Sequence, residues 1–244
     1  MRNLIESGLP IRRDLIDVHF QAWENMAKAG TWLTSERRVA IAAEVRQARE
    51  CEFCRLQKEA LTPNLVSGEH TSLGILTAEE VDAVHRIVSD PGRLSEAWYT
   101  SIIGKGLTPE EYVELVGQVA IVVMADTFAF GIGAEESTLP SPQKGKPSNY
   151  RSPGAKKRAA WVPITEPDDA VVSDGMLYSS KKAGYIQRAL SAVPDTKRDY
   201  WQIAEAHYLP SDSVYDFATA ARAISRPQIE VIAARVSALH QCLY

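Results

Sequence analysis

The segment from Ser35 to Leu61 constrains the fold of this chain more than any other, because its apolar and polar residues repeat with the period of an α-helix. Apolar residues such as Ile41, Val45 and Ala48 recur every three or four positions, so one face of this helix must be buried. We therefore predict one long helix over residues 35–61 at the edge of a core. A neighbouring polar stripe on the same helix contains Ala40, Glu44, Gln47, Cys51, Cys54 and Lys58.

Helical patterns also dominate the flanking sequence. Residues 15–29 form an amphipathic pattern that stops at Gly30, which suits a left-handed helix cap. Capping boxes at Thr77–Glu80 and Thr108–Glu111 predict two more helix starts. Charged and amide residues interrupt the apolar run 112–131, so we expect a central buried helix rather than a membrane span. No convincing series of strands is found, and the predicted fold class is all-α.

The chain divides into three predicted parts. Residues 1–138 form a helical unit, 139–184 form a proline-rich connector, and 185–244 form a partial second helical repeat. In the connector, Ala160-Trp161-Val162 is an apolar anchor that can hold it on the first unit. The repeat is visible when RRVAIAAEVRQARECEF is aligned without a gap with QIEVIAARVSALHQCLY, which places Cys242 under Cys51. Within the last part we expect helices over 186–193, 198–208, 214–224 and 227–244.

Composition excludes several classes of function. The formal charge of −4 and a pI near 5.8 give no electrostatic reason to expect nucleic acid or an anionic membrane as a partner. The first residues are charged and have no apolar core, so we expect no secretory signal. Three cysteines do not make a disulfide framework. We expect a reducing cytoplasm, where a Cys-x-x-Cys pair is more often catalytic or metal-binding than structural.

The two thiols are the main candidates for chemistry. Cys51 and Cys54 lie one helical turn apart and can close a disulfide. On the same stripe, Glu44 can move protons and Lys58 can stabilise a thiolate.

Three other polar residues are further candidates. His85 lies on or beside the buried stripe of the helix that starts at Thr77, and His70 lies in a polar loop. Asp126 interrupts the most apolar helix, either as a hydrogen-bonding core residue or as part of the site.

The Cys-x-x-Cys helix, followed by the segment GLTPEEYVELVGQVAIVVMADTFAFGIG, resembles the alkylhydroperoxidase AhpD-like and carboxymuconolactone decarboxylase superfamily. The resemblance covers about residues 15–133 and part of the C-terminal copy. It implies an all-helical fold and a homo-oligomer. In the AhpD branch it also implies a cysteine pair that reduces hydroperoxides and is reset by a dithiol or thioredoxin-like reductant. The resemblance would make Cys54 the attacking thiol and Cys51 the resolving thiol.

The chain departs from the AhpD pattern at two positions. Lys58 stands where the pattern has a histidine, and Val39 stands where it has a glutamate. We therefore expect Glu44 to act as the substitute base, with His85 and His70 as candidates for the missing imidazole.

Other interpretations remain open at this point. Cys51 and Cys54 could bind a metal together with His70 or His85, although the chain lacks a second ligand pair at standard spacing. A cofactor-free lyase of the same superfamily would not need the thiols, and a non-catalytic helical assembly module would need no site at all. The expected cofactor content is none, since no glycine-rich segment completes a nucleotide-binding motif.

Overall fold

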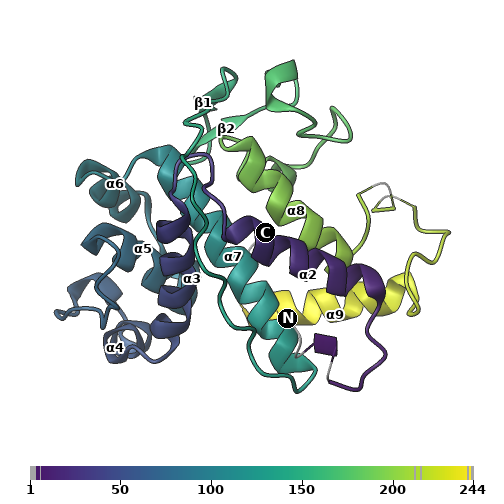
Figure 1. Ribbon diagram of the computed structural model, residues 1–244, viewed down its shortest axis with the longest axis horizontal. Coiled ribbons are helices and arrows are strands. Elements are labelled where there is room, and N and C mark those ends of the chain that lie inside the picture. Colours follow the sequence, from purple (N-terminus) through teal and green to yellow (C-terminus); the bar gives the residue numbers. More distant parts are fainter. Residues whose placement is uncertain (1–3, 6, 212, 215, 241, 243–244) are drawn as a thin grey trace.

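The computed structural model describes residues 4–5, 7–211, 213–214, 216–240 and 242, and over these residues the fold is all-α, as expected (Figure 1). The only sheet in the described ranges is a short antiparallel pair. The helices and strands are α2 (Arg13–Met26), α3 (Ser35–Arg49), α4 (Glu52–Glu59), α5 (Ala78–Ser89), α6 (Glu96–Gly104), α7 (Pro109–Gly131), β1 (Ala155–Lys157), β2 (Pro163–Thr165), α8 (Pro194–His207) and α9 (Arg226–Leu239).

Helix α7 is the centre of the fold. Helices α3, α5 and α8 pack against it, α3 packs against α5, and α2 packs against α8 (Figure 1). In the described part of the chain, α7 is the one helix long and apolar enough to cross a membrane, but 61% of its most apolar window is buried inside the protein. Leu115 and Val122 of this helix are fully buried. The prediction of a central buried helix is confirmed.

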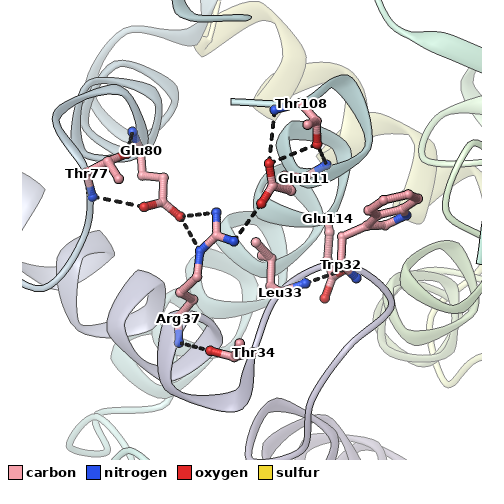
Figure 2. Close-up of polar contacts among 9 residues, drawn as sticks. All are labelled: Trp32, Leu33, Thr34, Arg37, Thr77, Glu80, Thr108, Glu111 and Glu114. Atoms are coloured by element: carbon pink, nitrogen blue, oxygen red, sulfur yellow. Dashed lines mark hydrogen bonds and ion pairs between the residues drawn. The ribbon is translucent and has the colours of Figure 1, made fainter. Parts of the chain in front are cut away.

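A single arginine joins the start of α3 to the starts of α5 and α7 (Figure 2). Both predicted capping boxes are present, formed by Thr77 with Glu80 and by Thr108 with Glu111. Arg37 of α3 donates to Glu80 at 2.8 Å through Nε and to Glu111 at 2.6 Å through Nη1. Each glutamate therefore caps its own helix and also accepts the guanidinium, which fixes three helix starts relative to one another.

The chain between α2 and α3 is held by a buried carboxylate rather than by a left-handed cap. Helix α2 ends at Met26, and Gly30 does not have a positive φ, so the predicted cap is wrong. Glu114 of α7 accepts the backbone N–H of Trp32 at 2.6 Å and that of Leu33 at 3.3 Å (Figure 2). A Cβ atom at Gly30 would lie 1.7 Å from Glu114 Oε1, so glycine is needed there for close approach.

The predicted single helix over residues 35–61 is wrong, because it is broken at Cys51. The last turn of α3 tightens, with Glu50 N–H donating to Gln47 and Cys51 N–H donating to Ala48. Cys51 then takes an extended conformation, with φ −77° and ψ 115°, and becomes the residue that precedes α4. Both halves keep the helical period, so the sequence pattern alone gave no sign of the break.

The proline-rich segment wraps over the helical unit through its predicted anchor. Strands β1 and β2 pair in antiparallel register, with Lys156 opposite Ile164. Trp161 and Val162, between these two positions, pack against the main hydrophobic core. The predicted apolar anchor is confirmed for Trp161 and Val162.

Two of the helices expected in the last part are absent from the described residues. Residues 186–193 contain only a short 3₁₀ turn, and Leu190 has a φ of 65°, which an α-helix does not allow. The described residues of 214–224 form turns and bends, where the Asp216 side chain accepts the N–H groups of Ala218 and Thr219. Such local side-chain bonds compete with the helix.

The repeat survives as local structure but not as packing. Aligned positions start the two helices, with Thr34 before α3 and Ser225 before α9. Ile41 and Val45 are fully buried, whereas the aligned Ile232 and Val236 are 57% and 49% exposed. Helix α9 ends at Leu239, before the predicted end at 244, and His240 and Cys242 are not helical, while residues 241 and 243–244 lie outside the described part. The two copies therefore share a helix start but have opposite environments.

Removing the arginine that joins the three helix starts should destabilise the fold. Glu80, which is 2% exposed in the native protein, loses its cation in Arg37→Ala, so we expect the free energy of unfolding to fall by about 2–4 kcal/mol. Urea denaturation measures the change. The matched control is Arg13→Ala, which removes an exposed i,i+4 pair with Asp17 and should cost less than about 0.5 kcal/mol. Equal effects of the two substitutions would contradict the structural role of Arg37.

Candidate thiol–histidine site

The two thiols lie at the start of α4, where the break after α3 places them. Cys51 precedes the helix and Cys54 follows one turn later. Both are buried, with exposed fractions of 3% and 2%. The start of a helix presents unpaired N–H groups and the positive end of the helix dipole, both of which favour a negatively charged sulfur.

His85 of α5 links Cys54 to a buried carboxylate. Its Nδ1 lies 3.2 Å from Cys54 Sγ, and its Nε2 lies 2.9 Å from Glu44 Oε1. His85 and Glu44 are both almost completely buried. Because Glu44 belongs to α3, this chain of contacts runs across the α3–α5 interface and ends at α4.

His70 reaches the same thiols from the loop between α4 and α5. Its Nδ1 lies 3.5 Å from Cys54 Sγ and 3.8 Å from Cys51 Sγ. Its Nε2 lies 3.2 Å from Asp82 Oδ1, and the other oxygen of Asp82 accepts Trp98 Nε1 at 2.6 Å. The two histidines therefore have the same arrangement, with Nδ1 toward sulfur and Nε2 toward a carboxylate.

The loop that carries His70 is fastened to the site itself. Thr71 N–H donates to Cys51 Sγ at 3.5 Å, and Leu73 N–H donates to Glu44 Oε2 at 3.2 Å. The ring of Phe53 packs on His70 with centroids 4.9 Å apart. Gly68 lies so close to this ring that a Cβ atom would be 2.5 Å from it. The loop is thus positioned by its backbone as well as by His70.

Electrostatics favours thiolates beside protonated imidazoles. Burial raises the pKa of Cys51, but hydrogen bonds from the backbone of Cys54 and Thr71 and from His70 outweigh it and lower the pKa to about 6. Burial is also outweighed at Cys54, where His70 and His85 lower the pKa. Burial lowers the pKa of His70, but Asp82 and the two thiols raise it to about 10. The pKa of His85 is raised for similar reasons, by Cys54 and Glu44.

The structure brings together five of the six residues selected from the sequence: Cys51, Cys54, Glu44, His70 and His85. Glu44 contacts His85 rather than Cys51, so its link to the thiols is indirect.

Two other residues named from the sequence lie elsewhere. Lys58 is exposed on α4 and is not among the groups that shift the pKa of either thiol. Asp126 is paired with Arg46 at 2.9 Å and with Arg49 at 3.0 Å, which makes it a buried ion-pair residue.

Asp82 is the functional residue that sequence reasoning missed. It lies three positions before His85 on the same helix, so a carboxylate and an imidazole one turn apart were visible in the sequence. Its partner is nevertheless His70, from a loop whose path no pattern predicts. The contact of the Thr71 N–H with Cys51 could not be predicted from the sequence either, because any residue except proline would supply a backbone N–H.

Comparison of the chain with protein-family models, with curated proteins and with solved structures found no match. The site must therefore be interpreted from its own geometry. Two thiols within reach of each other, two imidazoles and two carboxylates are compatible with redox chemistry or with metal binding.

The pKa of Cys51 should be visible in its reactivity. In metal-free native protein, alkylation of Cys51 by iodoacetamide should rise through pH 6 and level off by about pH 8, because only the thiolate reacts. In denaturant the rise should move to about pH 8.5. Peptide mapping by mass spectrometry follows Cys51 separately from the other thiols. The same midpoint in native and denatured protein would show that the site does not stabilise the Cys51 thiolate.

Proposed function

We propose that the protein is a thiol-dependent oxidoreductase that reduces hydroperoxides through Cys54 and Cys51. The observation that carries this proposal is the position of Cys54 Sγ, 3.2 Å from His85 Nδ1 and 3.5 Å from His70 Nδ1, with a second thiol beside it. A thiol peroxidase needs an attacking thiolate, a proton donor for the leaving oxygen, and a second thiol that closes a disulfide.

In the first step, the Cys54 thiolate attacks the terminal oxygen of the hydroperoxide. A sulfur–oxygen bond forms, the oxygen–oxygen bond breaks, and the alkoxide leaves as an alcohol after taking a proton. We assign that proton to His70, since it contacts both thiols and its loop lies nearer to solvent than α5. His85, tied to Glu44 and fully buried, holds the Cys54 thiolate in place.

In the second step, the Cys51 thiolate attacks the sulfenic acid on Cys54. A disulfide forms, the sulfur–oxygen bond breaks, and the hydroxide leaves as water after protonation. The two sulfurs lie within 4.8 Å of each other, so only a local movement at the start of α4 is needed. One hydroperoxide and two thiols thus give one alcohol, one water and one disulfide. An external dithiol or thioredoxin-like protein would reduce the disulfide by exchange.

The proposal agrees with the resemblance to the AhpD-like branch, in which the second cysteine attacks. On this proposal the protein works in a reducing cytoplasm and as a homo-oligomer, in which the exposed apolar residues of α9 would gain a packing surface. These residues are Val231, Ile232, Val236 and Leu239. No nucleic acid or membrane partner is proposed.

Two alternatives explain fewer contacts. A cofactor-free lyase or a non-catalytic assembly module would leave the thiol pair without a role. Neither accounts for two imidazoles that each join a thiol to a carboxylate.

Single-cysteine variants test the proposal and the roles of the two thiols. After one equivalent of an organic hydroperoxide, the native protein should lose two thiols, and Cys51→Ser should hold a sulfenic acid that dimedone traps. Cys54→Ser should give no trapped product, because it lacks the attacking thiol. Thiol titration and mass spectrometry measure both outcomes, and Cys242→Ser is the control because Cys242 lies exposed beyond α9. Oxidation no faster than that of a free small thiol would refute the peroxidase proposal.

Variants of His70 and Lys58 test which residue assists Cys54: the histidine that contacts the thiols, or the lysine at the position where the AhpD pattern has a histidine. We expect His70→Asn to slow sulfenic acid formation by about 10²-fold, since it removes the proposed proton donor. Lys58→Met should stay within about twofold of the native rate, because Lys58 is exposed. Stopped-flow measurement with an organic hydroperoxide gives both rates. The opposite ranking would favour Lys58 as the thiolate-stabilising group.

A further inference from the structure

Four side-chain atoms at the thiol–histidine site form a compact donor set. They are Cys51 Sγ, Cys54 Sγ, His70 Nδ1 and His85 Nδ1, and all lie within 4.8 Å of one another. In a tetrahedral zinc site with the usual bond lengths, a sulfur and a nitrogen ligand are ~3.6 Å apart and two sulfurs ~3.8 Å apart. Three of the four sulfur–nitrogen distances are 3.2, 3.5 and 3.8 Å, and the other donor pairs lie within 4.8 Å. The donors are therefore already near the spacing that one ion requires.

The groups behind the two imidazoles fit a metal site as well. A metal-bound histidine usually gives its other ring nitrogen to a carboxylate, which fixes the ring and its tautomer. His85 Nε2 lies 2.9 Å from Glu44, and His70 Nε2 lies 3.2 Å from Asp82. Both carboxylates are held in turn, Glu44 by Leu73 N–H and Asp82 by Trp98 Nε1. Both rings therefore point Nδ1 at the same small volume.

The donor chemistry selects the kind of ion. Two thiolates and two imidazoles suit Zn²⁺, whereas Mg²⁺ and Ca²⁺ prefer oxygen ligands. The two thiolate charges would neutralise the ion. Three of the four ligands are buried and the fourth, His70, is largely covered, which is typical of a closed site with four protein ligands.

We propose that Cys51, Cys54, His70 and His85 bind one Zn²⁺ ion in a tetrahedral site. Binding of the ion does not depend on the peroxidase proposal, but one consequence does rest on it: bound zinc occupies both thiolates and so slows their reaction with hydroperoxide. When peroxide does oxidise the site, the zinc-bound thiolates, one hydroperoxide and two protons give the disulfide, one alcohol, one water and free Zn²⁺. The thiols would thus be less reactive while zinc is bound and more reactive after it is released.

The direct test uses full-length reduced protein that has been treated with a chelator. Calorimetric titration with Zn²⁺ should give one ion per chain, and Co²⁺ should give the intense visible bands of a tetrahedral site together with sulfur-to-metal charge transfer. Binding of no zinc, or an octahedral Co²⁺ spectrum without charge transfer, would overturn the proposal. Circular dichroism before titration confirms that each protein tested is folded.

Variants locate the ion. Cys51→Ser and His70→Ala should each abolish tight binding or shift the Co²⁺ spectrum, and Asp82→Asn should weaken zinc binding by about 10–100-fold through His70. Cys242→Ser is the matched control and should bind one ion with native affinity, because this thiol lies exposed beyond α9. Loss of zinc in Cys242→Ser, or unchanged binding in both Cys51→Ser and His70→Ala, would place the ion elsewhere and contradict the proposal.

The two proposals can fail separately. Zinc binding without thiol oxidation by hydroperoxide would leave the metal site standing and remove the peroxidase. Disulfide formation in reduced, metal-free protein that binds no zinc would do the reverse. If both hold, zinc-loaded protein should react with hydroperoxide at least tenfold more slowly than metal-free protein and should release one Zn²⁺ per disulfide formed, which a chromophoric chelator reports.

Discussion

The ion pairs of Arg37 with two capping glutamates are the constraint on which the rest of the helical unit depends. Glu80 and Glu111 accept the backbone N–H groups of Thr77 and Thr108, the residues that precede α5 and α7, and the same carboxylates accept the guanidinium from α3. The same two carboxylates thus cap their helices and bind α3. A shift of α3 along α5 would separate Arg37 from the buried carboxylate of Glu80. The Glu44–His85 contact lies further along this α3–α5 interface and inherits its alignment.

The site itself is a balance between burial and charge. Burial alone would raise the pKa of both thiols and lower that of both histidines, which would leave every group neutral. Instead, each histidine lies between a sulfur and a carboxylate, and these negative partners outweigh burial. The protonated imidazoles in turn stabilise the thiolates. Glu44 and Asp82 contact the imidazoles rather than the sulfurs, and they help the thiols to raise the pKa of both histidines.

Redox chemistry and metal binding draw on the same property of this site. Both require two thiolates held close together, and both use the imidazole nitrogen that faces sulfur. In redox chemistry this nitrogen would donate its proton, and in metal binding it would lose the proton and bind the ion. On the two proposals, a disulfide would use the two sulfurs that a zinc ion also needs, so the oxidised form and the zinc-bound form would exclude each other. On these proposals, the concentrations of free zinc and of hydroperoxide would decide which form prevails.

Local patterns in the sequence determined the all-α class, both capping boxes and the buried α7, because helical period and capping act over only a few residues. Five site residues were selected from their chemical type and from the family resemblance. Tertiary structure alone decided the break at Cys51, the role of Asp82 and the path of the loop that brings His70 to the thiols. Each of these depends on contacts between segments far apart in the chain, such as His70 with Cys51 and Leu73 with Glu44. The α9 repeat makes the same point: its sequence fixes a helix, but only the fold determines whether that helix is buried.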